Sequence, residues 1–193
     1  MTGPATRPEA TATGPTATAA APSGADGTGP APDESVAPPG DRDAPLAGGW
    51  VTMRPAGSAT LCVTEGRERN HRTDREIAVQ LPCAEAPRPR VYLEHVRGAV
   101  YRVQWHHPAH GRGCLGVDEP ASAEEGEELL SPGACTDVAR MQFRLEPFRG
   151  GYRMRPVDSG QCLGLLPPRT RGAEVVQVPC ADSADQSFHF RPA

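Results

Sequence analysis

The chain has 193 residues, of which 37% are hydrophobic and only 5% aromatic, and its formal net charge at pH 7 is −4. Residues 1–48 hold two of the 20 basic and six of the 24 acidic residues, so residues 49–193 hold 18 of each and are neutral. A neutral region without a basic stripe is a poor candidate for nucleic-acid binding, and no apolar stretch is long enough to cross a membrane.

The N-terminal segment, residues 1–48, consists mainly of Ala, Thr, Pro and Gly, and Val36 and Leu46 are its only larger aliphatic residues after Met1. Such a segment cannot bury enough surface to offset the entropy lost on ordering, so we expect residues 1–48 to form a disordered linker. The start of the chain also lacks the charged region and apolar core of a signal peptide, which by itself favours the cytoplasm. Residues 49–193 have the size of one domain.

Apolar residues alternate in short runs throughout residues 49–193, which is typical of strands. Trp50, Tyr101 and Tyr152 each open such a run at an equal spacing. We therefore expect three repeats of four strands, at about 49–97, 98–148 and 149–193. The expected strands are, in chain order, 50–54, 60–64, 77–81, 91–96, 100–105, 113–117, 128–130, 141–145, 152–156, 161–165, 174–178 and 187–190. An all-β fold with this threefold repetition fits a β-trefoil best.

The six cysteines fall two to a repeat. They are Cys62 and Cys83, Cys114 and Cys135, and Cys162 and Cys180. One interpretation is three disulfides, which would favour a location outside the reducing cytoplasm and would strengthen a core that is poor in aromatic side chains. The other is that the cysteines are small reduced core residues of a cytoplasmic protein. The missing signal peptide and the paired cysteines point to different compartments, and the sequence leaves that choice open.

Each repeat contains a motif close to Cys-Leu-x-aliphatic, as in Cys114-Leu115-Gly116-Val117, and the third repeat also contains Gln186-x-Phe188 near its end. Together with the threefold period, these motifs resemble the ricin B-type lectin domain family over residues 49–193. The resemblance implies a β-trefoil and a non-catalytic module that recognises a carbohydrate or another small polar ligand of the cell envelope. It also implies the disulfide pairs Cys62–Cys83, Cys114–Cys135 and Cys162–Cys180.

The family's sugar pockets use a carboxylate two residues after the first cysteine and an aromatic residue in the strand before the second. The first position holds Thr64, Gly116 or Gly164, and the second holds Leu81, Ser131 or Pro132, or Val178. Pockets that lack these residues leave hydroxyl groups of the sugar unmatched, at a cost of about 1–3 kcal/mol each. All three pockets therefore depart from the family's usual sugar-binding pattern. The third repeat is the least degraded. Its expected ligand-binding residues are Asp185, Gln186, Gln177 and Phe188.

A second resemblance concerns the segments 50–55 and 104–108, Trp-Val-Thr-Met-Arg-Pro and Gln-Trp-His-His-Pro. They are similar to trefoil-like C-terminal regions of actinobacterial proteins, some of which follow a helix-turn-helix domain through a Pro/Ala-rich linker. This implies an alternative function, a ligand-sensing or protein-interaction domain related to XRE-type transcriptional regulators, without sugar binding and with a protein partner. A third alternative is a cell-surface spacer.

Two segments of the second repeat contain metal-ligating residue types, namely His106, His107 and His110, and the acidic run from Asp118 to Glu128. In a strand His106 and His107 point to opposite faces, and the acidic run lacks the pattern of a calcium loop. We therefore predict solvated loops, with no metal and no cofactor. Six cysteines in three matched pairs leave no thiolate nucleophile, and no catalytic motif appears, so we expect no catalytic residues. We also expect the protein to be a monomer.

Overall fold

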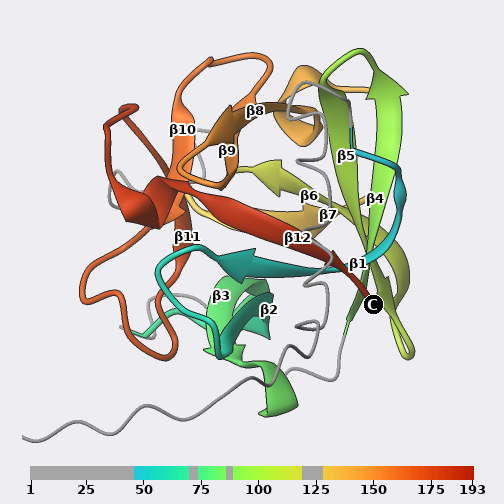
Figure 1. The fold of residues 1–193 in the computed structure, drawn as a ribbon. Coiled ribbons are helices and arrows are strands. Elements are labelled where there is room, and N and C mark those ends of the chain that lie inside the picture. The colour runs from blue at the N-terminus through green and yellow to red at the C-terminus, as the bar shows by residue number, and fades with distance from the viewer. Residues whose placement is uncertain (1–45, 70–73, 86–88, 119–127) are drawn as a thin grey trace, which may run out of the picture. The chain divides into compact units, whose positions relative to one another are not determined.

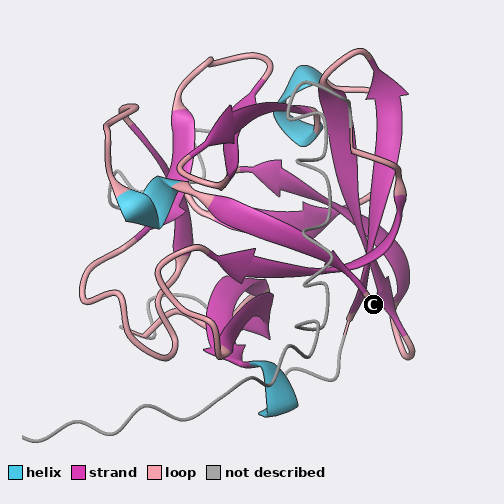
Figure 2. Ribbon diagram, in the orientation of Figure 1, coloured by secondary structure: helices cyan, strands magenta, loops and turns pink. Residues whose placement is uncertain are grey.

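The computed structural model describes residues 46–69, 74–85, 89–118 and 128–193, which belong to one compact unit, Pro39–Ala193. Residues 1–45, most of the predicted linker, lie outside the described residues, as does most of the acidic run, 119–127. The described part is all-β, with short single-turn helices between the strands (Figures 1 and 2). None of the helices in the described ranges is long and apolar enough to cross a membrane.

Twelve strands are found in the described residues, and each overlaps one of the predicted strands. They are β1 (Gly49–Pro55), β2 (Leu61–Gly66), β3 (Ile77–Pro82), β4 (Arg90–Arg97), β5 (Val100–His107), β6 (Gly111–Val117), β7 (Leu130–Gly133), β8 (Phe143–Phe148), β9 (Gly151–Pro156), β10 (Cys162–Leu165), β11 (Val175–Val178) and β12 (Phe188–Pro192). The 3-10 helices are η1 (Cys83–Glu85), η2 (Ala139–Met141) and η3 (Ala184–Gln186).

Two predicted strands are displaced. Strand β7 begins at Leu130, where the prediction ended, and runs on to Gly133, because pairing with β6 places Cys114 opposite Gly133 despite the weak strand propensity of Pro132 and Gly133. Strand β8 begins at Phe143, because Met141 belongs to η2. Sequence patterns missed the three short helices, which are too short to show a helical period.

Six strands form a closed antiparallel barrel in the order β4-β1-β12-β9-β8-β5, and the pairing of β4 with β5 closes it. The other six form three hairpins, β2–β3, β6–β7 and β10–β11. Each predicted repeat therefore supplies two barrel strands and one hairpin, which Figure 1 shows along the colour gradient. Closing the barrel leaves its six strands without a free edge.

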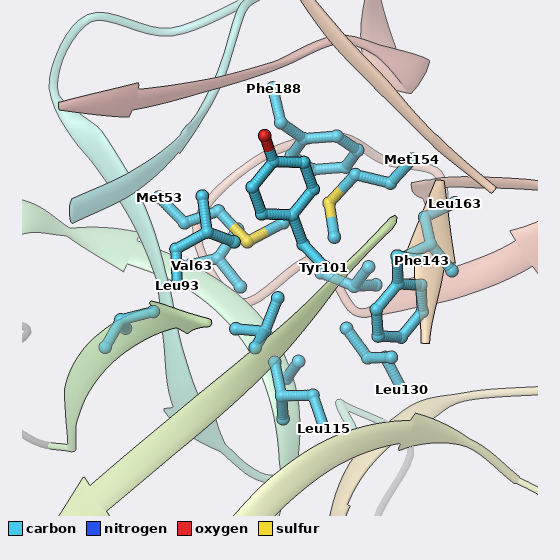
Figure 3. Close-up of a cluster of buried hydrophobic side chains, with 14 of the residues drawn as sticks. Met53, Val63, Leu93, Tyr101, Leu115, Leu130, Phe143, Met154, Leu163 and Phe188 are labelled. Carbon is cyan, nitrogen blue, oxygen red and sulfur yellow. The ribbon is translucent and has the colours of Figure 1, made fainter. Parts of the chain in front are cut away.

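The core lies inside the barrel, where alternate residues of each strand point inward. In β1, for example, Val51 and Met53 are buried while Trp50 is exposed. Three aromatic residues, Tyr101, Phe143 and Phe188, supply its largest fully buried side chains (Figure 3). These three and Trp105, four of the nine aromatic residues of the chain, belong to the core. A smaller cluster joins the three hairpins through Ile77, Val79, Leu129 and Val176.

The structure contains three disulfides with the pairing that the family resemblance implied. Each joins the two strands of one hairpin or their ends, with Cα atoms 4.8–4.9 Å apart and sequence separations of 21, 21 and 18 residues. All six cysteines lie in the described ranges, and none of them is free there. Each repeat is therefore crosslinked within itself.

We expect the double substitution Cys114→Ala and Cys135→Ala to lower the free energy of unfolding by about 3 kcal/mol, because a closed loop of this length restricts the unfolded chain by about that amount. Urea denaturation of the variant and the parent, both oxidised, measures the difference. If the reduced parent unfolds at the same urea concentration as the oxidised parent, the disulfides do not contribute to stability and the prediction is wrong.

Candidate ligand-binding site

Two of the predicted ligand-binding residues, Gln186 and Phe188, are buried. Gln186 is 3% exposed; its Oε1 accepts a hydrogen bond from the Ala181 N–H at 2.8 Å, and its Nε2 donates to the Pro179 carbonyl at 2.8 Å. The amide thus holds the chain on either side of Cys180. Phe188 is 0% exposed and belongs to the barrel core, so its ring offers no surface to a ligand.

The other two predicted residues, Asp185 and Gln177, already have polar partners. The Asp185 side chain is 8% exposed, accepts a hydrogen bond from Ser183 Oγ, and lies 3.2 Å from Arg169 Nε. A Cβ atom at Gly164 would lie 3.3 Å from the Asp185 carboxylate and 3.3 Å from the Gln186 side chain, so these two residues do meet around Gly164. Gln177 instead accepts from Ser159 Oγ at 2.5 Å and donates to Glu128.

A cavity of about 330 Å³ lies in the second repeat, beside Gly116. Asp118 lines it, but its carboxylate is occupied by the guanidinium of Arg75 and by Ser131 Oγ, which donates at 2.6 Å. Arg140 and Met141 form another part of the wall. The acceptor that a sugar hydroxyl needs is therefore engaged within the protein.

A second cavity, of about 260 Å³, is lined by residues of the β2–β3 and β5–β6 hairpins, including Glu65, Glu76 and His107. His107 Nδ1 accepts hydrogen bonds from the N–H groups of Ala109 and His110 at 3.0 and 3.1 Å, so the proton of the neutral ring lies on Nε2, 3.9 Å from Glu65. Across the described part of the chain, no group of three or more His, Cys, Asp or Glu side chains is arranged to hold a metal ion.

A third cavity, of about 240 Å³, lies in the first repeat, and we name it the Trp50 cavity. Its walls come from β1, β2, the beginning of β4 and the Cys62–Cys83 disulfide. Its lining side chains include Trp50, Thr52, Arg54 and Arg90. Among the described residues that line it there is no Asp or Glu, which distinguishes it from the two cavities above.

Trp50 is the most exposed aromatic side chain of the described residues, at 37%, and it lies within an aromatic cluster. Its ring centroid is 5.2 Å from that of Tyr92 and 4.9 Å from that of His106, both in edge-on contact. The guanidinium carbon of Arg90 lies over the ring, 4.0 Å from its centroid. These contacts fix the ring in place while leaving part of it exposed at the cavity.

Strand pairing explains how these residues meet. Trp50 is opposite Tyr92 on β4, and β4 in turn places Arg90 opposite His106 on β5. Alternation along β1 puts Trp50, Thr52 and Arg54 on the outward face. The sequence could have shown that alternation, but Arg90 and His106 join Trp50 only through the register of three strands, for which the chain has no local signal.

Comparisons with known proteins support the fold. No protein-family model and no curated protein sequence matches the chain. Among solved structures, the designed threefold-symmetric protein ThreeFoil has a TM-score of 0.59 at 15% identity, covering 75% of this chain and 99% of its own. A Polyporus squamosus lectin, solved with a human-type influenza-binding epitope, has a TM-score of 0.59 at 14% identity, covering 76% of this chain and 50% of its own.

A third similar structure is an exo-β-1,3-galactanase from Clostridium thermocellum, with a TM-score of 0.59 at 12% identity, covering 78% of this chain and 31% of its own. This chain thus spans half of the lectin and about a third of the galactanase. At such identities the comparisons bear on the fold alone. Threefold-symmetric and lectin neighbours, a six-strand barrel and three hairpins together support a β-trefoil, lectin-like fold for the described residues.

Proposed function

We propose that residues 49–193 form a non-catalytic carbohydrate-binding module and that the Trp50 cavity is its binding site. The observation that supports this most directly is the exposed part of the Trp50 ring beside hydrogen-bonding side chains in one cavity. A sugar ring has an apolar face and a rim of hydroxyl groups, so it needs both kinds of surface together. The third repeat, by comparison, uses Asp185 and Gln186 in contacts within the protein.

The polar groups of the Trp50 cavity suit a hydroxyl-rich ligand. Thr52 Oγ1 makes only a long hydrogen bond, 3.5 Å, to the Arg191 carbonyl, so its hydroxyl is available for a better partner. Arg54 also lines the cavity, and one of its Nη atoms donates to the Ala59 carbonyl at 3.0 Å. Arginine carries five N–H donors, which matches the many lone pairs of a saccharide.

The lectin and the galactanase among the similar structures agree with a carbohydrate ligand. Their low identity means that the location of the site rests on the geometry of this chain and not on theirs. We propose the Trp50 cavity in preference to the third-repeat pocket that the sequence favoured, which stays a prediction, and the experiment below separates the two.

We expect Trp50→Ala to weaken carbohydrate binding at least tenfold, because exposed aromatic residues that anchor a ligand commonly contribute more than about 1.4 kcal/mol. The measurement is a screen of soluble polysaccharides against residues 1–193, followed by titration calorimetry with the best ligand. Val138→Ala is the matched control, since Val138 is also 37% exposed and lies outside the cavity. It should leave the affinity unchanged.

A third variant, Asp185→Ala, tests the alternative site. If this variant loses binding and Trp50→Ala retains it, the ligand binds in the third repeat and the proposed site is wrong. If no polysaccharide binds the parent protein, the carbohydrate function itself is wrong, and a protein-interaction domain becomes the leading account.

A further inference from the structure

The Trp50 cavity has an unbalanced charge. Two guanidinium groups, those of Arg54 and Arg90, lie among its lining residues, and neither forms an ion pair with a carboxylate of the described residues. Ala193 also lines the cavity. Two other arginines of the described strands do have such partners, Arg102 with Glu94 and Asp137 and Arg155 with Glu146. The cavity thus has a local positive charge in a neutral domain.

Among the described residues, none accepts a hydrogen bond from the Arg90 guanidinium. Its guanidinium lies over the Trp50 ring at 4.0 Å, so the ring occupies one face of the planar group. A guanidinium stacked in this way still presents its N–H groups along its edge, in the fork that matches a carboxylate or a similar oxyanion. Stacking on an aromatic ring also restricts the side chain before a ligand arrives, which lowers the entropy lost on binding.

Arg54 supplies a second, partly unsatisfied cation. Its Nε is buried and has no hydrogen-bond partner in the described part of the chain, while one Nη donates to the Ala59 carbonyl. The positive charge of its guanidinium would attract an anion in the adjacent cavity. Arg54 lies on β1 and Arg90 on the neighbouring strand β4, and both line the cavity.

From this arrangement we propose that the Trp50 cavity recognises an acidic saccharide, one that carries a carboxylate or sulfate group on its sugar ring. The anion binds the edge of the Arg90 guanidinium with support from Arg54, and the sugar ring lies against the exposed part of Trp50. This inference rests on the proposed carbohydrate function and specifies the class of ligand.

The probes are two matched pairs of polysaccharides: polygalacturonate with its fully methyl-esterified form, and dextran sulfate with dextran. Within each pair the sugar backbone is the same, and the members differ in whether it carries the anionic group. We expect the parent chain to bind at least one acidic member ten times more tightly than its neutral partner. The pair that shows this preference identifies the anion as carboxylate or sulfate.

Arg90→Gln should reduce the affinity for the acidic member at least ten times more than it reduces the affinity for the neutral member. The control is Arg144→Gln on β8, which makes the same change of charge at an exposed arginine outside the cavity. We expect it to change both affinities by less than twofold. Circular dichroism and thermal unfolding of each variant verify that it is folded.

Three results would overturn the inference, and they are distinguishable from failure of the proposed function. Equal binding of the acidic and neutral members, lost in Trp50→Ala, keeps the carbohydrate function and removes the acidic ligand. Equal losses in Arg90→Gln and Arg144→Gln reveal attraction by net charge without a site. Absence of binding to all four polysaccharides contradicts both proposals.

Discussion

Phe188→Ala is expected to lower the free energy of unfolding by about 3–5 kcal/mol, the usual cost of removing a large aromatic side chain from a core. Phe188 is 0% exposed and lies in the same cluster as Tyr101 and Met154 (Figure 3). It is also opposite Pro55 on β1 and Tyr152 on β9, so its ring fills the barrel where the first and third repeats meet. The space left by alanine could not be refilled by one neighbouring strand alone.

The matched control is Phe190→Ala, which removes the same side chain two residues along β12. Phe190 is only partly buried and packs against the edge of the core, so we expect a loss of less than half of that for Phe188→Ala. Urea denaturation monitored by circular dichroism measures both values. This pair separates core packing from a general effect of losing an aromatic residue.

The variant Phe188→Ala also tests the ligand-binding role that the family resemblance gave to Phe188. In buffer without denaturant, the folded fraction of Phe188→Ala should bind carbohydrate with the affinity of the parent, because the ring does not reach the surface. A variant with parental stability and no binding would support the ligand-binding role and contradict the core position.

The fold could be predicted because its signals are local and repeated three times. Trp50, Tyr101 and Tyr152 each mark the first strand of a repeat, and all twelve strands lie close to their predicted ranges. The disulfide pairing, in contrast, came from the family resemblance, and the structure agrees with it. The errors in the predicted strands are at their ends. Strand β7, for example, extends beyond its predicted end because pairing with β6 overrides the weak strand propensity of Pro132 and Gly133.

The candidate site could be predicted much less well, because it depends on which residues remain available after folding. Asp185, Gln186 and Gln177 have the right chemistry for a sugar, but each forms hydrogen bonds within the protein. Whether a polar side chain is engaged by its own chain depends on contacts between distant residues. The Trp50 cavity depends in the same way on the register of β1, β4 and β5.

A second large loss of stability is expected for Arg69→Ala, about 3–5 kcal/mol, because it leaves a buried carboxylate without its partner. Glu174 has only 3% of its side chain exposed and accepts hydrogen bonds from the Arg69 backbone N–H at 2.8 Å and from Arg69 Nε at 2.9 Å. The same guanidinium donates to the carbonyls of Pro168 and Leu166 at 2.7 and 3.1 Å. One side chain of the first repeat thus holds a loop of the third.

The control for this substitution is Arg67→Ala, two residues away. Arg67 pairs with Glu76 at 3.2 Å, but both side chains are well exposed, at 47% and 36%. Exposed ion pairs contribute little, so we expect a change within about 0.5 kcal/mol. If both arginines give the same loss, the burial of Glu174 is not the cause and the prediction is wrong.

Acid should remove the contribution of Glu174 to the stability of the fold. Burial raises the pKa of its carboxyl group, but the hydrogen bonds from Arg69 outweigh burial and hold the pKa below its ordinary value. A carboxyl group whose pKa is lower in the folded state stabilises the fold above its unfolded pKa of about 4.3, and that contribution is lost as the pH falls through the folded value.

The difference in stability between the parent and Glu174→Gln should therefore be largest at neutral pH and decrease on acidification below about pH 4. Urea denaturation of both proteins across this range measures it, and a difference that grows in acid would mean that Arg69 does not hold the carboxylate in its charged form.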